Sequence, residues 1–145
     1  MLEICQGGSN TDSGVKRGVQ YQLGQMKSDY RAIALVDDDK DIINLFTDLL
    51  KENGFEIFGF ANPLVLLDYI HHHANQFRLI LIDYKMPQIT GCELANKITD
   101  INSRIDMVLI TAAEDIVNNN LNMEIIRKPI RMHQLLQLVA KYISL

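Results

Sequence analysis

The sequence has only two cysteines, Cys5 and Cys92, which stand 87 positions apart without a Cys-x-x-Cys pair or a zinc-type Cys and His spacing. A disulfide framework and a zinc site are therefore not expected. No apolar run approaches the roughly 18 residues that cross a bilayer. The first 20 residues also lack the apolar centre of a signal peptide. We expect a soluble, cytoplasmic protein.

Basic charge is also scarce. The 145 residues include 14 Lys and Arg against 18 Asp and Glu, for a formal net charge of −4. A nucleic-acid binder usually carries a basic face, and a protein of the membrane surface carries a polybasic segment. The charge balance argues against both kinds of partner, while 48% apolar residues are enough for one globular domain.

The first 29 residues differ from the rest of the chain. Five of the eight glycines fall here, among Ser, Thr, Asn and Gln, and no helical or strand period runs through residues 15–25. Such a segment buries too little apolar surface to offset its ordering entropy. We therefore expect a flexible N-terminal tail at residues 1–29 and a folded domain at residues 30–145.

Short apolar segments predict five β-strands. Three of them are continuous rather than alternating, which is typical of parallel strands covered on both faces: Ala32–Val36, Leu79–Ile82 and Met107–Ile110. Glu56–Phe60 and Glu124–Arg127 are weaker candidates.

Apolar residues at helical spacing fall between these strands. One stripe includes Ile42, Leu45, Phe46 and Leu50 and ends at Gly54, a common C-terminal signal. Three more stripes lie at residues 65–70, 94–98 and 135–142. The alternation predicts an α/β fold, a doubly wound five-stranded parallel sheet with right-handed crossovers.

Polar residues follow four of the five strands. They are Asp37-Asp38-Asp39, Asp83, Thr111 and Lys128. In open parallel sheets the reactive residues collect outside the carboxyl ends of the strands, so we expect these side chains to converge.

The converging residues suit phosphoryl chemistry. Two carboxylates 4 Å apart repel by about 4 kcal/mol at an effective dielectric of 20, and Asp37, Asp38 and Asp83 would need a cation such as Mg²⁺. Lys128 offers a charge for phosphoryl oxygens and Thr111 a hydroxyl, as phosphoryl transfer onto a carboxylate requires. The plainer alternative is a solvated acidic edge that caps the following helix.

These residues resemble the receiver domain of two-component response regulators. The resemblance covers roughly residues 31–145 and implies a flavodoxin-like sheet with strand order 2-1-3-4-5. The motifs that carry it are Leu35-Val36-Asp37-Asp38-Asp39, Leu81-Ile82-Asp83-Tyr84-Lys85-Met86-Pro87 with Gly91, Ile110-Thr111-Ala112 and Arg127-Lys128-Pro129.

The resemblance implies a role for each matching residue. Asp83 would accept the phosphoryl group. Mg²⁺ would be held by Asp37, Asp38, Asp83 and the backbone carbonyl of Lys85. Thr111 would contact the phosphoryl group.

The resemblance also assigns the remaining motif residues. Lys128 would contact the phosphoryl group, Pro129 would hold its loop, and Gly91 would permit the turn before the third helix. The implied function is a stand-alone signalling switch rather than an enzyme, with no turnover beyond its own phosphoryl transfer and slow autodephosphorylation. Its phosphodonor would be a sensor histidine kinase, a phosphotransfer protein or a small acyl phosphate, and its target an unidentified protein.

Three features depart from the family pattern. Ile125 stands where the family usually has an aromatic residue, and Thr111 and Lys128 are 17 positions apart, fewer than the pattern implies. We therefore expect a shortened fourth helix. Lys85 and Ala113 occupy positions that tune loss of the phosphoryl group, and they favour slow loss. The alternative function is a receiver-fold interaction module in which phosphorylation is weak or secondary.

Overall fold

The structure, a computed structural model, describes residues 31–112 and 121–143. The expected tail at residues 1–29 and the expected short fourth helix lie outside the described residues, as does Ala113, so these expectations stay predictions. Among the helices of the described part, none is long and apolar enough to cross a membrane.

Five parallel strands form one sheet in the order β2-β1-β3-β4-β5. They are β1 (Ala32–Val36), β2 (Ile57–Phe60), β3 (Phe77–Asp83), β4 (Asp106–Thr111) and β5 (Glu124–Arg127). The doubly wound α/β fold with strand order 2-1-3-4-5 is confirmed, and each predicted strand is present within three residues of its expected bounds.

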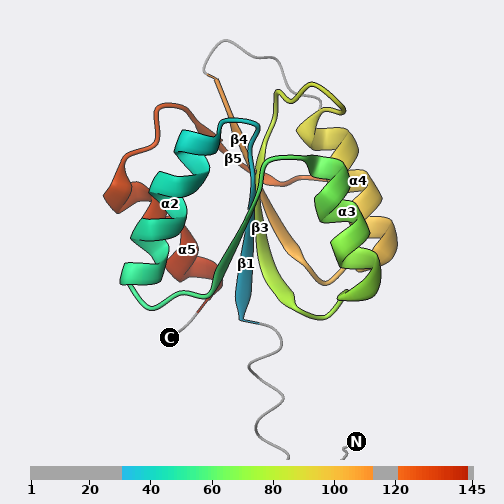
Figure 1. The fold of residues 1–145 in the computed structure, drawn as a ribbon, viewed down its shortest axis with the longest axis horizontal. Coiled ribbons are helices and arrows are strands. Elements are labelled where there is room, and N and C mark those ends of the chain that lie inside the picture. The colour runs from blue at the N-terminus through green and yellow to red at the C-terminus, as the bar shows by residue number, and fades with distance from the viewer. Residues whose placement is uncertain (1–30, 113–120, 144–145) are drawn as a thin grey trace, which may run out of the picture. The chain divides into compact units, whose positions relative to one another are not determined.

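Helices cover both faces of the sheet (Figure 1). Helices α2 (Lys40–Glu52) and α5 (Met132–Tyr142) pack on one face, and α3 (Pro63–His72) and α4 (Gly91–Ile101) pack on the other. Successive strand residues point to opposite faces. Leu81 therefore joins the core under α2 and α5, and Ile82 joins the core under α3 and α4.

The sheet register aligns the carboxyl ends of the strands. Val36 is the partner of Ile82, Asp83 is the partner of Ile110, and Thr111 is the partner of Arg127. Residues that follow these strands are thereby brought to one edge of the sheet, as the topology of parallel strands requires.

The buried face of α2 differs from the predicted stripe. Ile43, Phe46 and Leu50 are its buried residues, whereas Leu45 is 45% exposed. The three buried positions are spaced i, i+3 and i+7, and Leu45 lies about 100° around the helix from Phe46. The prediction that Leu45 belongs to the buried stripe was therefore wrong, and its side chain borders the solvent.

Candidate functional site

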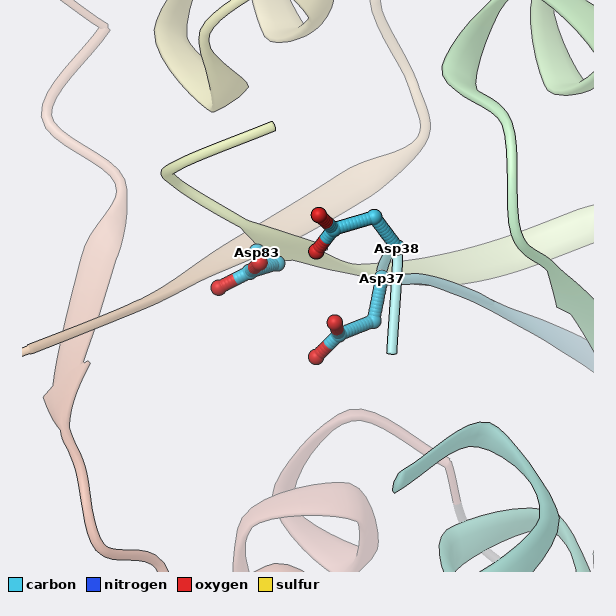
Figure 2. A group of neighbouring side chains, drawn as sticks. All are labelled: Asp37, Asp38 and Asp83. Atoms are coloured by element: carbon cyan, nitrogen blue, oxygen red, sulfur yellow. The ribbon is translucent and has the colours of Figure 1, made fainter. Parts of the chain in front are cut away.

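Three carboxylates gather where β1 and β3 end. Each of Asp37, Asp38 and Asp83 offers an oxygen that lies within 4.8 Å of the oxygens of the other two. Figure 2 shows these side chains together at the edge of the sheet. Asp37 and Asp83 are buried, at 4% and 5% exposure, while Asp38 is exposed. A solvated acidic edge does not describe two carboxylates that are almost removed from water.

The backbone after β1 holds the first carboxylate in place. The Asp39 amide donates a hydrogen bond of 2.9 Å to Oδ1 of Asp37. Asp39 is itself the N-cap of α2, since its Oδ1 accepts from the amides of Asp41 and Ile42 at 2.9 and 3.4 Å. The three consecutive aspartates therefore divide into two cluster members and one helix cap.

Lys128 places a positive charge against the buried carboxylates. Its Nζ atom lies 2.9 Å from Oδ1 of Asp83 and 3.9 Å from Oδ2 of Asp37. Its backbone amide donates a 2.7 Å hydrogen bond to the carbonyl oxygen of Thr111, and the following peptide bond to Pro129 is cis. The end of β4 thus anchors the residue whose side chain completes the cluster.

Burial governs the protonation of this cluster. Desolvation, reinforced by the charge of Asp83 and opposed by the hydrogen bond from Asp39, raises the pKa of Asp37 to about 6. Burial also raises the pKa of Asp83, against the lowering effect of Lys128. Burial opposes the charged form of Lys128, but the hydrogen bond to Asp83 and the surrounding carboxylates prevail, and the pKa of Lys128 is raised.

Two further predicted site residues, Thr111 and Lys85, lie at the end of β4 and in the loop after β3. Thr111 ends β4, is 1% exposed and is joined to Lys128 through the main-chain hydrogen bond described above. Lys85 lies in the loop that follows Asp83, with an exposed side chain. The structure therefore brings oxygens of Asp37, Asp38 and Asp83 to within 4.8 Å of one another and Lys128 to within 3.9 Å of two of these carboxylates. It places Thr111 at the end of β4 and Lys85 in the loop after β3.

Gly91 is required by close packing against the end of β3. A Cβ atom built on Gly91 would lie 2.8 Å from the carbonyl oxygen of Asp83 and 2.9 Å from Cα of Tyr84. The Gly91 amide also donates a 2.7 Å hydrogen bond to the Tyr84 carbonyl. Glycine is needed at position 91 because the backbone there lies so close to the backbone of Asp83 and Tyr84 that a side chain would not fit. Gly91 is also the first residue of α4.

Ile125 lies in β5 opposite Leu109 of β4. Its side chain is partly buried and packs against the core under α3 and α4. An aliphatic side chain at this position has no ring or hydroxyl to present at the surface.

Sequence reasoning missed a cavity beside the carboxylates. It has a volume of about 530 Å³, and Asp37, Asp83 and Lys128 form part of its wall. The rest is mostly apolar and comes from Leu35, Ile42, Leu45, Phe46, Ile110, Ala112, Pro129 and Ile130, with Asp39. Because α2 and the segment after β5 build it together, no local pattern in the sequence indicates it.

A family model described as the response regulator receiver domain matches residues 33–140. The chain belongs to the response regulator receiver domain family. The fold, the strand order and the acidic edge above are those of a receiver domain of two-component signalling systems.

Known relatives agree with this assignment. The receiver chain is 28% identical over 91 residues, 63% of its length, to the phosphoglycerate transport system transcriptional regulatory protein PgtA of Salmonella typhimurium, and spans 21% of that relative. It is 26% identical over 118 residues to sporulation initiation phosphotransferase F of Bacillus subtilis, a match to 78% of this chain and 94% of the relative.

A solved structure agrees in fold. The CheY-like receiver domain protein of Methanospirillum hungatei has a TM-score of 0.70 to this chain at 24% identity, over 77% of this chain and 92% of that one.

Proposed function

We propose that this receiver domain is a phosphoryl-accepting signalling switch in which Asp83 takes the phosphoryl group. The observation that carries the proposal is the pairing of a buried Asp83 carboxylate with the Lys128 ammonium at 2.9 Å, beside two further carboxylates. A nucleophilic carboxylate, a fixed cation and an acidic metal site are the components that phosphoryl transfer onto aspartate needs.

The donor set fits Mg²⁺. Carboxylate oxygens are ligands that suit Mg²⁺, and each of the three aspartates offers one oxygen that lies within 4.8 Å of those of the other two. Asp37, Asp38 and Asp83 would hold the ion, with the backbone carbonyl of Lys85. When bound, Mg²⁺ supplies positive charge against the phosphoryl oxygens.

The chain's own residues then carry the transfer. An oxygen of the Asp83 carboxylate attacks phosphorus, and the bond from phosphorus to the donor's nitrogen or oxygen breaks with its electron pair left on the donor. No proton has to leave Asp83, since the nucleophile is the carboxylate. Lys128 would pair with an oxygen of the transferred group, and we assign the Thr111 hydroxyl to another.

Partners follow from the family. Receiver domains interact with histidine kinases and phosphotransfer proteins, and we infer that a sensor histidine kinase or a phosphotransfer protein supplies the phosphoryl group here. The phosphorylated form would act by docking on a downstream protein in the cytoplasm. We also infer slow autodephosphorylation, favoured by the positive charge of Lys85. A phosphorylated form that lasts only seconds would contradict this point.

Ile125 favours a second candidate function. Because its partly buried aliphatic side chain packs into the core under α3 and α4, it cannot provide the aromatic readout of the family pattern. The domain would then serve as a protein-interaction module in which phosphorylation is weak.

Incubation with acetyl phosphate and Mg²⁺, followed by intact-mass measurement, separates the two functions. We expect a gain of one phosphoryl mass, lost in Asp83→Asn and retained in Asp39→Asn, whose side chain caps α2 instead. A receiver domain of known activity verifies the reagent. An unchanged mass favours the interaction module, and a gain that survives Asp83→Asn contradicts the role of Asp83.

A further inference from the structure

Charged and apolar side chains together line the cavity beside Asp83. Its charged residues are Asp37, Asp39, Asp83 and Lys128. Its apolar lining includes the buried residues Phe46, at 6% exposure, and Ile110, at 4%, together with Leu45, which is 45% exposed. Its volume of about 530 Å³ lies within the usual range of small-molecule sites.

This combination matches a ligand with an anionic head and an apolar tail. The Lys128 ammonium lies 2.9 Å from Asp83 and is suited to phosphoryl oxygens. The side chains of Ile42, Leu45 and Ile130 offer carbon atoms to whatever extends from that head. A methyl group would leave this wall exposed to water, whereas a longer apolar chain would cover it.

In-line displacement places the leaving group of a phosphodonor on the side of phosphorus away from Asp83. In phosphoryl transfer the attacking and leaving oxygens stand roughly in line across phosphorus. Asp83 forms part of the cavity wall, and α2, Pro129 and Ile130 border the same cavity, so a donor that approaches Asp83 from the cavity side has these residues beside its leaving group.

We propose that the cavity holds the acyl group of a small phosphodonor and that this site prefers acyl phosphates with an apolar chain longer than acetyl. The inference rests on the proposed role of Asp83. In the step, a carboxylate oxygen of Asp83 forms a bond to phosphorus and the bond from phosphorus to the acyl oxygen breaks. The electron pair leaves with the acyl oxygen as a free carboxylate, and no proton or redox partner is required.

Butyryl phosphate and acetyl phosphate test the preference directly, because butyrate and acetate are similar leaving groups. Two additional methylenes that enter an apolar wall raise the second-order rate constant about 15-fold, at roughly fourfold for each buried methylene. Succinyl phosphate is the matched control, since it has the same chain length as butyryl phosphate but ends in a carboxylate that the apolar wall rejects. The measurement is the rate of phosphoryl-mass gain in the full chain with Mg²⁺.

A pair of leucine variants locates the effect. Leu45→Gln makes the cavity margin polar, and we expect it to reduce the ratio of the butyryl phosphate rate constant to the acetyl phosphate rate constant several-fold. Leu64→Gln is its control, because Leu64 is similarly exposed, at 50%, but lies on α3 outside the cavity. Both leucines are exposed enough for the variants to fold.

The outcomes separate this inference from the proposed function. Equal rates with acetyl and butyryl phosphate overturn the inference and leave Asp83 as phosphoacceptor. The inference is also overturned if Leu64→Gln reduces the preference for butyryl phosphate as much as Leu45→Gln does. Failure of both donors to modify the protein overturns the inference and the proposed function together.

Discussion

The Nζ atom of Lys128 lies 2.9 Å from Oδ1 of Asp83, at the point where two strands of the sheet end. The Asp83 side chain is 7% exposed and the Lys128 side chain 39%, so the carboxylate is fixed in the protein while the ammonium reaches in from the margin. A cation that arrives on a flexible stem can stay with the carboxylate or move to an added phosphoryl oxygen.

We therefore predict that Lys128→Gln slows phosphorylation of Asp83 by acetyl phosphate by about 10- to 100-fold. This is the range that one charge-assisted hydrogen bond of roughly 1.5–3 kcal/mol gives. Initial rates of mass gain in saturating Mg²⁺ measure it. Lys141→Gln is the control, because Lys141 pairs with Glu124 at the other end of β5. Wild-type rates in Lys128→Gln would show that the contact has no part in the transfer.

The second prediction concerns Mg²⁺ and pH. Burial raises the pKa of Asp37 to about 6, so protons compete with the metal below that pH. We expect the Mg²⁺ affinity measured by calorimetry to be roughly tenfold weaker at pH 5 than at pH 7.5. Asp38→Asn should weaken binding at both pH values, and Asp39→Asn should not. An affinity that does not change between the two pH values would contradict protonation of the cluster.

The same raised pKa predicts how the metal affects stability. A carboxylate with a raised pKa holds its proton longer in the folded state, so the metal-free protein loses stability as the pH rises from about 4 to about 6. Above that range the loss is complete, and Mg²⁺ offsets the repulsion between the carboxylates. Addition of a chelator to the Mg²⁺ form should therefore lower the Tm more at pH 7.5 than at pH 5. An equal change at both pH values would contradict this sign.

Much of the fold was predictable because parallel strands covered on both faces have continuous apolar sequences. The bounds of Ala32–Val36 and Glu124–Arg127 agree with the structure residue for residue. The convergence of Asp37, Asp83 and Lys128 followed from topology alone, because parallel strands end at one edge. Their distances and burial could not follow from it, since these depend on side-chain packing.

The face of α2 shows where sequence reasoning reaches its limit. One stretch of α2 contains four apolar residues within five positions, Ile42, Ile43, Leu45 and Phe46. Several helical stripes of similar apolar content pass through them. Which stripe is buried depends on how α2 packs on the sheet and beside α5, which are tertiary contacts. Leu45 consequently became exposed at the margin of a cavity that no sequence pattern indicated.

The fourth prediction compares two glycines. In Gly91→Ala the new Cβ would meet the Asp83 carbonyl oxygen at 2.8 Å, and in Gly59→Ala it would clash with Cγ2 of Ile43. Both changes should destabilise the fold by about 1–3 kcal/mol, because the packing is already full. Gly91→Ala displaces the backbone of the phosphoacceptor, so we expect it alone to slow phosphorylation, by about tenfold or more. Equal rates in the two folded variants would show that the Gly91 contact does not position Asp83.

The fifth prediction tests a pair far from the site. Both oxygens of Glu124 accept hydrogen bonds from Lys141 Nζ, at 2.9 and 2.7 Å, and Oε1 also accepts from the Tyr142 hydroxyl at 2.7 Å. The hydrogen bond from Lys141, with that from Tyr142, lowers the pKa of Glu124 against the effect of burial. The contribution of the ionised Glu124 to stability is therefore complete above its pKa in the unfolded chain. It is lost as the pH falls through the pKa of Glu124 in the folded protein.

Glu124→Gln should consequently destabilise the domain near pH 7 by no more than about 1 kcal/mol, since the Lys141 side chain is 58% exposed and solvent screens the pair. The difference from wild type should shrink between pH 7 and a more acidic pH, as the wild-type glutamate also becomes neutral. Urea unfolding at the two pH values measures it, and phosphorylation by acetyl phosphate should be unchanged because the pair is remote from Asp83. A difference that grows on acidification would mean that the folded state favours the protonated form of Glu124, opposite to the sign that its contacts with Lys141 and Tyr142 require.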